Sequence, residues 1–287
     1  MKPVCDVLGV ARSNVHGRVH RGAAWTDQRK GRRPRDDQEL KAELHAVITP
    51  HATYGYRRAA ALVNRRRCEL RRTTVNHKRV YRVMREAGWL LARHTGRPLD
   101  SRAHDGTIAV TGSNRRWCSD GFEIGCTNAE RVRVAFALDC CDREAMSWVA
   151  TTGGIDGGLV CDLMVEAVES RFDDALPDPP IEWLSDNGSP YVARDTRAFA
   201  QQINLLPRTT AINSPQSNGM AESFVKTFKR DYVGQMDRSD ALTVMHQLPA
   251  AFEHYNTVHP HSALKMLSPR LFRQQQAQLS NSPCPEK

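Results

Sequence analysis

Residues 181–189 read IEWLSDNGS, and this stretch decides which kind of fold the chain can form. Residues 181–185 are a short, mostly apolar run of the kind that forms a buried strand. Asp186 follows directly, and Asn187 with Gly188 then makes a turn. A carboxylate at the carboxyl end of a strand, before a glycine turn, lies where open α/β sheets present their ligands. The stretch therefore predicts a strand of an α/β sheet with a candidate functional acid at its end.

The segments on either side of this strand show the patterns of further strands and helices. Period-two alternation of apolar residues predicts strands over 131–138 and 147–151. Helical spacing predicts four helices, over residues 159–172, 196–203, 220–232 and 240–256. Strands that come first and then alternate with helices indicate a mixed α/β layer fold.

Two more acids stand at positions that suggest chemistry. Asp120 follows Trp117 by three residues, and Glu222 lies in the first turn of the predicted helix 220–232, with 35 residues between Asp186 and Glu222. Each acid alone has an ordinary explanation, because Asp before Asn-Gly is common in turns and the helix dipole favours Glu in a first turn. Their ordered set suggests one shared site.

The N-terminal third carries the whole positive charge excess of the chain. Residues 1–104 hold 24 Lys and Arg against 9 Asp and Glu, an excess of +15, whereas the remaining 183 residues hold 17 against 23, which is −6. This asymmetry favours a nucleic-acid partner for residues 1–104 over a merely solvated basic surface.

Small helical units are predicted within this basic third. Residues 4–19 have the pattern of a short helix-turn-helix, and residues 38–91 have that of a second helical unit. The last helix of this unit is predicted over 75–87 and ends before Gly88. Its basic side chains point away from its apolar stripe and are candidate DNA contacts: Lys78, Arg79, Arg82 and Arg85. A solvated helix face is the alternative explanation.

Composition excludes several other classes of protein. Of the eight cysteines none forms a Cys-x-x-Cys pair, so neither a zinc site nor a disulfide framework is predicted, and we expect reduced thiols. No apolar run approaches the ~20 residues that span a bilayer. We therefore expect a soluble cytoplasmic protein with no membrane partner.

The ordered acids resemble the integrase core of transposases and retroviral integrases, a superfamily defined by two Asp and one Glu. The 35-residue separation and the run SPQSNG at 214–219, followed by Ala-Glu-Ser, are similar to the motifs of that superfamily. Residues 183–189 and the run HYN at 254–256, with Pro-His after it, resemble bacterial insertion-sequence transposases translated from the second of two overlapping reading frames. The runs YGYR at 54–57 and KRVYR at 78–82 resemble the helix-turn-helix of that group. The likeness extends over about residues 1–272.

This resemblance implies an RNase H-like integrase core, a mixed five-stranded sheet flanked by helices, preceded by small all-α helix-turn-helix units. It implies catalytic, metal-binding roles for Asp120, Asp186 and Glu222 with two Mg²⁺ ions, for which Mn²⁺ can substitute. By analogy, Asp120 bridges both ions and the other two acids hold one each. Such a site clamps a scissile phosphate, so that water frees a 3′-hydroxyl that then attacks another DNA strand.

The first motif departs from the family pattern. The family has Thr two residues after the first Asp, whereas here Gly121 and Phe122 follow Asp120. Asp139 and Asp142 are therefore rival candidates, and we prefer Asp120 because Trp117 keeps its family spacing.

Three residues around Glu222 are further candidate DNA contacts. Lys226 and Lys229 follow Glu222 by four and seven residues, which places all three on one face of a helix. Similar integrases carry basic residues there that touch DNA ends, and Asn218 belongs to the matching loop. A Glu–Lys pair on a solvated helix is the alternative.

We expect the following organisation: a helix-turn-helix-like segment at 1–20, a basic linker at 21–37, a helix-turn-helix domain at 38–95, a linker at 96–113, an integrase catalytic core at 114–274 and a disordered tail at 275–287. The resemblance implies a transposase that binds terminal inverted repeats and target DNA, cleaves and transfers strands, and self-associates on DNA ends near the nucleoid. It also implies a first-reading-frame partner protein, joined in some products as a frameshift fusion. The alternatives are an inactive DNA-binding regulator and a structure-specific nuclease with the same core.

Overall fold

The computed structural model describes residues 2–7, 9–21, 36–92, 110–209 and 219–281. The chain divides into two compact units, residues 1–39 and residues 40–287. The first unit contains two short helices, α1 (Lys2–Val7) and α2 (Arg12–Val19). None of the described helices is both long and apolar enough to cross a membrane.

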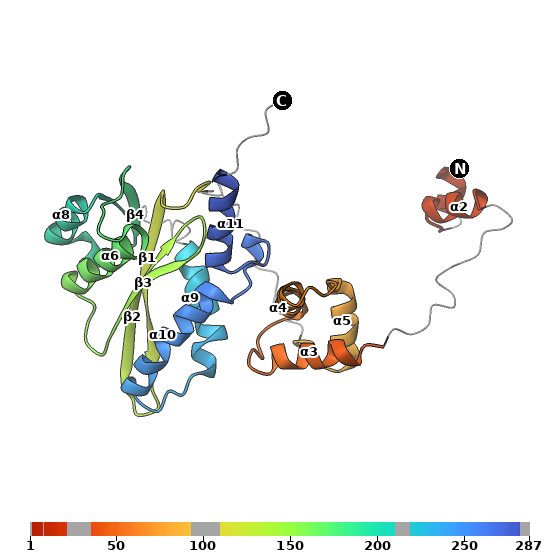
Figure 1. The fold of residues 1–287 in the computed structure, drawn as a ribbon, viewed down its shortest axis with the longest axis horizontal. Coiled ribbons are helices and arrows are strands. Elements are labelled where there is room, and N and C mark those ends of the chain that lie inside the picture. Colours follow the sequence, from red (N-terminus) through yellow and green to blue (C-terminus); the bar gives the residue numbers. More distant parts are fainter. Residues whose placement is uncertain (1, 8, 22–35, 93–109, 210–218, 282–287) are drawn as a thin grey trace. The chain divides into compact units, whose positions relative to one another are not determined.

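The second unit begins with three helices that share a small core (Figure 1). These are α3 (Gln38–Ile48), α4 (Tyr56–Glu69) and α5 (His77–Glu86). Leu40 and Leu44 are buried in it, as the helical spacing predicts. The last helix begins two residues later than expected because Asn76 caps it, its side chain accepting a hydrogen bond from the Lys78 amide. It ends at Glu86, before Gly88 with a φ of 72°.

A mixed five-stranded sheet forms the centre of the catalytic part of the chain. Its strands are β1 (Arg116–Gly125), β2 (Arg131–Asp139), β3 (Ala145–Thr151), β4 (Ile181–Ser185) and β5 (Leu205–Thr209). The order across the sheet is β3-β2-β1-β4-β5. The first three strands form an antiparallel meander, and β4 and β5 extend the sheet in parallel from β1. The fold class is therefore the expected α/β class.

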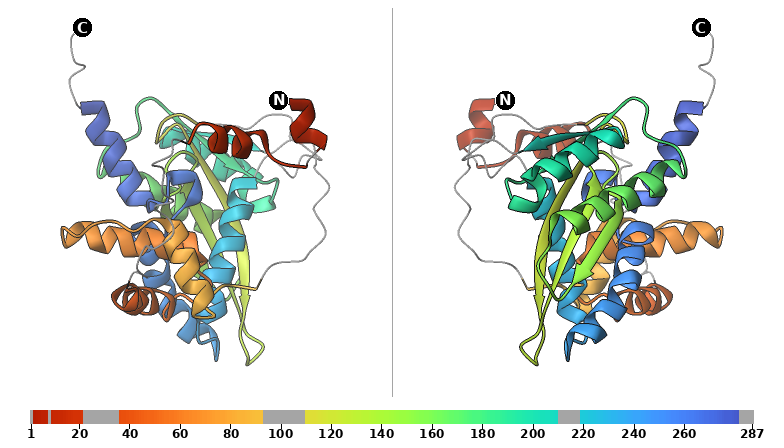
Figure 2. Two further views of the ribbon diagram at one scale, coloured as in Figure 1. Left: turned by 90° about the vertical axis from the view of Figure 1, so that its right-hand side faces the viewer. Right: turned by 90° about the vertical axis from the view of Figure 1, so that its left-hand side faces the viewer.

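Helices cover both faces of the sheet (Figure 2). One face packs against α6 (Gly157–Phe172), α7 (Ser189–Val192) and α8 (Arg194–Gln202). The other packs against α9 (Gly219–Asp231) and α10 (Ala241–Thr257). Strand β2 is covered on both faces because its side chains alternate between two apolar cores. Val134 and Phe136 lie in the core on the α9 side, and Ala135 and Ala137 lie in the core on the α6 side.

The end of the chain differs from the expected disordered tail at 275–287. Helix α11 (Pro269–Asn281) continues through the first seven residues of that segment, and residues 282–287 lie outside the described part. Pro269 suits a first helical position, and the Gln, Ala and Leu residues that follow favour helix. Arg270 and Arg273 of α11 form ion pairs with the buried Glu144, which fastens the helix to the sheet.

Candidate active site

Strand β1 presents Asp120 on the face of the sheet that α9 covers. Side chains alternate along a strand, and Trp117 belongs to the core on the α6 side. Cys118 and Phe122 belong to the core on the α9 side, so Asp120, which lies between them at the same parity, faces α9 as well. Trp117 thus anchors the strand on one face while Asp120 emerges, partly buried, on the other.

Parallel pairing brings Asp186 to the level of Asp120. The register of β1 and β4 pairs Cys118 with Leu184, and each candidate acid stands two residues further along its own strand. Neighbouring strands lie ~4.8 Å apart, so Asp120 and the residue that directly follows β4 come close together in the sheet. Leu184 packs in the α9-side core, and Asp186 follows two residues later, directly after the strand ends.

The turn after β4 holds the Asp186 carboxylate in place. The amide of Gly188 donates a hydrogen bond of 2.9 Å to Asp186 Oδ1, and the carboxylate is otherwise exposed. A Cβ at position 188 would lie 2.9 Å from the same oxygen, closer than real Cβ atoms approach. Glycine at this position therefore allows the amide to reach the carboxylate.

Helix α9 carries Glu222 in its first turn, as predicted. The helix is fixed to the sheet by aromatic packing, with Phe224 4.4 Å from Phe136 and Phe228 5.8 Å from Phe122 between ring centroids. Glu222 lies on the exposed side of the same turn as the buried Ala221. The acid is thus attached to a rigid element that packs on the strand of Asp120.

The charges of Asp186 and Glu222 act on Asp120. Burial raises the pKa of Asp120, the Gly121 amide that donates to it at 2.8 Å opposes this rise, and the negative charges of Asp186 and Glu222 raise the pKa further. In the part of the chain that the structure describes, no three His, Cys, Asp or Glu side chains already stand close enough to hold a metal ion. The donor set nevertheless fits one, because it offers three carboxylates whose mutual repulsion a cation would relieve.

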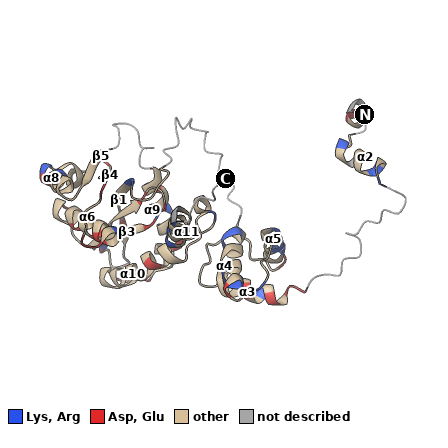
Figure 3. Ribbon diagram, turned by 45° about the horizontal axis from the view of Figure 1, so that its top comes forward, with Lys and Arg blue, Asp and Glu red and all other residues tan. Residues whose placement is uncertain are grey.

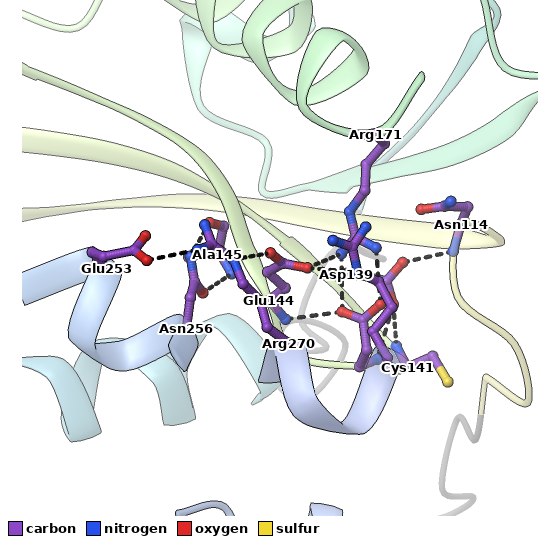
Figure 4. Close-up of polar contacts among 11 residues, drawn as sticks. Asn114, Asp139, Cys141, Glu144, Ala145, Arg171, Glu253, Asn256 and Arg270 are labelled. Atoms are coloured by element: carbon purple, nitrogen blue, oxygen red, sulfur yellow. Dashed lines mark hydrogen bonds and ion pairs between the residues drawn. The ribbon is translucent and has the colours of Figure 1, made fainter. Parts of the chain in front are cut away.

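The rival acids Asp139 and Asp142 belong to a different, structural network (Figure 4). Both are fully buried. Asp139 accepts hydrogen bonds from the amides of Asn114, Cys141 and Asp142, while Asp142 forms a two-pronged pair with Arg171 at 3.0 Å. Burial and then the negative charge of Asp142 raise the pKa of Asp139, while Arg171 opposes this rise.

The position of Asp139 explains this separation. It pairs with Trp117 in the β1–β2 register, whereas Asp120 pairs with Phe136. Asp139 therefore lies three residue pairs along the ladder from Asp120, at the end of β2. Its hydrogen bonds stabilise the β2–β3 connection, and they leave its carboxylate without the exposure that a substrate needs.

The two lysines of α9 lie on exposed positions of the helix. The ammonium of Lys229 lies 5.7 Å from the centre of the Phe122 ring, so it stands over β1, two residues beyond Asp120. Phe122 occupies the position where the family motif has Thr, and it packs against α9 instead. Asn218, the remaining residue expected to touch DNA here, lies outside the described residues.

The predicted DNA contacts of the helix-turn-helix lie on α5, whose Lys and Arg residues are coloured blue in Figure 3. Lys78 and Arg85 are exposed, and Arg79 and Arg82 are half-buried. Arg82 forms an ion pair of 3.3 Å with Glu86 one turn later. The basic side chains thus share one helix, opposite its buried residues Val80, Val83 and Met84.

A hydroxyl pair beside the acids was not predicted. Ser119 and Tyr191 share a buried hydrogen bond of 2.9 Å, which connects β1 to the helix that follows Asp186. Burial raises the pKa of Tyr191, and its hydroxyl therefore stays protonated. Strand alternation could have indicated this pair, because Ser119 must face the α6-side core, where a polar group needs a partner.

The comparison with known proteins agrees with this architecture. Residues 110–215 and 205–269 match two family descriptions of the integrase core domain, and residues 34–97 match the HTH-like domain. The chain is 51% identical over 286 residues to the transposase InsD for insertion element IS2A/D/F/H/I/K of Escherichia coli, across 99% of this chain and 94% of the relative. The transposase InsD for insertion element IS2-9 of Escherichia coli strain K12 is equally similar and is covered to 92%.

Among solved structures, a chain of the simian T-cell lymphotropic virus intasome in complex with a PP2A regulatory subunit is similar at 15% identity. Its TM-score is 0.49, over 86% of this chain and 76% of that one. The catalytic core domain of BIV integrase is similar at 15% identity, with a TM-score of 0.41 over 59% of this chain and 99% of that one.

The mixed five-stranded sheet, the match to the integrase core domain and the HTH-like domain before it define a polynucleotidyl transferase with an integrase core. Within that class, the chain belongs to the family of insertion-element transposases.

Proposed function

We propose that this transposase binds the terminal inverted repeats of its own element and both cuts and joins DNA strands at Asp120, Asp186 and Glu222. The observation that carries the proposal is the electrostatic coupling of these acids, in which Asp186 and Glu222 raise the pKa of Asp120. Three carboxylates drawn from a strand, a strand end and a helix start repel one another, and a site of this kind is favourable when cations bind.

The three carboxylates would hold two Mg²⁺ ions, for which Mn²⁺ can substitute. Bound metal ions stabilise the charge on a phosphodiester under attack and promote ionisation of the attacking hydroxyl. Asp186 is kept in a fixed orientation by the Gly188 amide, and Glu222 by the packing of α9 on β1 and β2. The protein's own contribution is therefore to hold the ligands and the DNA in place before the reaction begins.

Basic side chains would hold the DNA on either side of the chemistry. Lys226 and Lys229 lie about one and two turns after Glu222 on α9, where they would bind phosphates of the DNA end. Asn218 belongs to the same proposed contact. Lys78, Arg79, Arg82 and Arg85 on α5 would bind the inverted repeat, with α5 in the major groove.

Assembly and partners follow from the reaction. Joining two element ends to one target requires two copies of the site, so we propose self-association on the DNA ends. We also propose that the first-reading-frame protein of the element cooperates with this chain, as a separate partner or as a frameshift fusion, and that both act at the nucleoid.

Replacement of one acid tests the proposed site. Asp186→Asn keeps the shape of the side chain but removes the charge that holds a cation, so cleavage and joining of labelled element ends should fall by at least about two orders of magnitude. Binding of the same DNA in a gel-shift assay should remain close to that of the unchanged protein. Loss of binding in parallel would mean that Asp186 has a structural role.

The wild-type reaction separates the proposed function from the two alternatives. An inactive regulator would bind the ends and leave them uncut when Mg²⁺ is added. A structure-specific nuclease would cut them but give no strand-transfer product. Chelation of the metal by EDTA should abolish both cutting and joining, and an equal concentration of Asp139→Asn protein that remains folded should retain them.

A further inference from the structure

A buried polar contact fastens the three-helix unit α3–α5 to the end of helix α9. From α4 and the turn before it come Tyr54 and Arg58, and from the other side come Asp231, the last residue of α9, and His259. We call these four residues the joint. They connect positions up to 205 residues apart in the sequence.

Asp231 carries a buried charge that two arginines satisfy. Arg58 Nη1 donates to Asp231 Oδ2 at 2.8 Å, and Arg230 donates to both carboxylate oxygens at 2.7 Å. The Asp231 side chain is fully buried, whereas that of Arg58 is 24% exposed. Removing a partner from a buried carboxylate costs free energy. The Arg58 contact therefore favours the observed position of α4 against α9 over other positions.

Aromatic and imidazole groups give the joint a defined geometry. The Tyr54 hydroxyl and His259 Nδ1 form a buried hydrogen bond of 2.9 Å, and the Tyr232 hydroxyl forms another, of 3.0 Å, with His254 Nδ1. The ring of His51 lies 4.7 Å from both Tyr54 and His254. Since hydrogen bonds and ring contacts weaken quickly with displacement, this set permits little sliding.

A second arginine of α4 reaches the same segment of the core. Arg65 Nη1 donates to the carbonyl of Val258 at 3.1 Å and to that of Thr257 at 3.5 Å. Arg58 and Arg65 lie two turns apart on α4, so the helix is held at two points along its axis. Two points of attachment restrict rotation of α4 as well as translation.

Helix α9 connects the joint directly to the proposed active site. Glu222 lies in its first turn and Asp231 at its end, nine residues later, which is roughly 14 Å along a rigid helix. The packing of Phe228 on Phe122 of β1, and of Phe224 on Phe136 of β2, restricts movement of this helix relative to Asp120. The distance from the helix-turn-helix to the three acids is therefore fixed through α9.

We propose that the joint selects the scissile phosphodiester by fixing the distance between the bound DNA sequence and the three acids. The α3–α5 unit binds its DNA sequence, and the joint then sets which phosphodiester, at a fixed number of base pairs from that sequence, lies over Asp120, Asp186 and Glu222. Arg58, Asp231, Tyr54 and His259 are positioning residues, because they touch neither DNA nor the reacting atoms. The inference rests on the proposed function, since it assumes that this chain cuts DNA.

The test is the position of the cut, mapped at single-nucleotide resolution on labelled element ends. The unchanged protein should give one dominant nick. Arg58→Met keeps the length of the side chain but removes its charge, so the share of nicks at the dominant position should fall several-fold in favour of neighbouring phosphodiesters. The DNA footprint of the α3–α5 unit should stay in place, and Arg58→Lys should restore part of the dominant cut.

Two further variants keep the test decisive. Tyr54→Phe removes only the hydroxyl, with its hydrogen bonds to His259 and Tyr232, and it should spread the nicks in the same way even if Arg58→Met folds poorly. Arg66→Met removes one charge from an exposed position of the same helix, so it should leave the nick position unchanged. A single unshifted nick in both Arg58→Met and Tyr54→Phe, with only the rate or stability lowered, would overturn the proposal.

Failure of the proposed function would look different. If the unchanged protein binds the ends with a clear footprint but never cuts them, the proposal that this chain cleaves DNA is wrong. If the unchanged protein cuts at one position and the joint variants cut at the same position, the proposed cleavage is supported. Only the proposal that the joint selects the position of the cut is then wrong.

Discussion

At the scale of single residues, Gly188 controls the carboxylate that precedes it. A Cβ at this position would lie 2.9 Å from Asp186 Oδ1, and the amide of the same residue donates to that oxygen. Gly188→Ala can be accommodated if the carboxylate turns away, since it is the free end of a side chain. We therefore expect strand cleavage to fall about tenfold or more, the effect of about 1.4 kcal/mol on the barrier, while the thermal midpoint changes little.

Gly125→Ala provides the matched control for that substitution. Gly125 ends β1, and a Cβ there would meet no atom within 4 Å. Its cleavage rate should stay close to that of the unchanged protein. Comparable losses in both variants, or a Gly188→Ala protein whose thermal midpoint drops as much as its activity, would contradict the role given to the turn.

The sequence predicted the positions of the acids but not their surroundings. Asp186 could be placed from the strand and turn around it, and Glu222 from its helix start. The choice among Asp120, Asp139 and Asp142 could not be made from local pattern, because all three lie in or beside strands. What separates them is the buried pairing of Asp142 with Arg171, which is 29 residues away in the sequence.

At the scale of secondary-structure elements, helix α9 supports both the acid and the proposed DNA contacts. Replacing Lys226 and Lys229 together with Ala should reduce strand joining more than metal binding, because the three carboxylates remain. Ala favours helix, and Phe224 and Phe228 still hold α9 on the sheet. Loss of two phosphate contacts should flatten the log–log dependence of DNA affinity on salt by about two units.

A salt titration of end binding by both proteins measures this directly. The double variant Arg194→Ala with Arg197→Ala is a suitable control, because it removes two charges from α8 on the opposite face of the sheet. It should leave the slope unchanged. Equal slopes and equal joining rates for the α9 variant and the unchanged protein would mean that Lys226 and Lys229 lie on a solvated helix surface and do not contact DNA.

The elements that the sequence did not predict have physical reasons for their weak patterns. Strand β1 contains Asp120 and Gly121 in its middle, so its apolar alternation is interrupted where the chemistry is proposed. Strand β5 contains Pro207, which argues against a central strand but is tolerated here because β5 pairs only with β4, at the edge of the sheet. Helix α11 gains its stability from ion pairs with Glu144, which are invisible in its own segment.

At the scale of the whole molecule, residues 40–287 form one compact unit that contains both the helices α4 and α5 and the five-stranded sheet. The expected linker at 96–113 lies almost entirely outside the described residues. The contacts that join the two parts run between Tyr54 or Arg58 and residues near the end of the chain. Contacts between residues so far apart in the sequence produce no local periodicity. The sequence therefore shows the motif around His259 but does not predict the residues that it contacts.

The same region predicts how stability depends on pH. Burial lowers the pKa of three histidines, to about 4 for His254 and His261 and about 2 for His259, and it lowers the pKa of His51 as well. Arg58 adds to this lowering for His259 and His261, while the negative charge of Asp231 opposes it.

The sign of the effect follows from proton binding. In the unfolded chain these histidines have pKa values near 6.5 and take up protons below that pH, whereas in the folded protein they stay neutral until the pH is much lower. The folded state therefore has its full stability above about pH 6.5 and loses it progressively as the pH falls towards 4. Urea unfolding at pH 7 and at pH 5 should show a lower free energy of unfolding at pH 5.

Two histidine variants identify the source of that dependence. His254→Gln keeps an acceptor for the Tyr232 hydroxyl but removes one titrating group, so the loss of stability between pH 7 and pH 5 should become smaller. His246→Gln changes an exposed histidine on the same helix and should leave the loss as it was. If the unchanged protein and both variants lose the same stability, the buried histidines do not set the acid sensitivity of the molecule, and the carboxylates, with Asp231 first among them, would have to carry it.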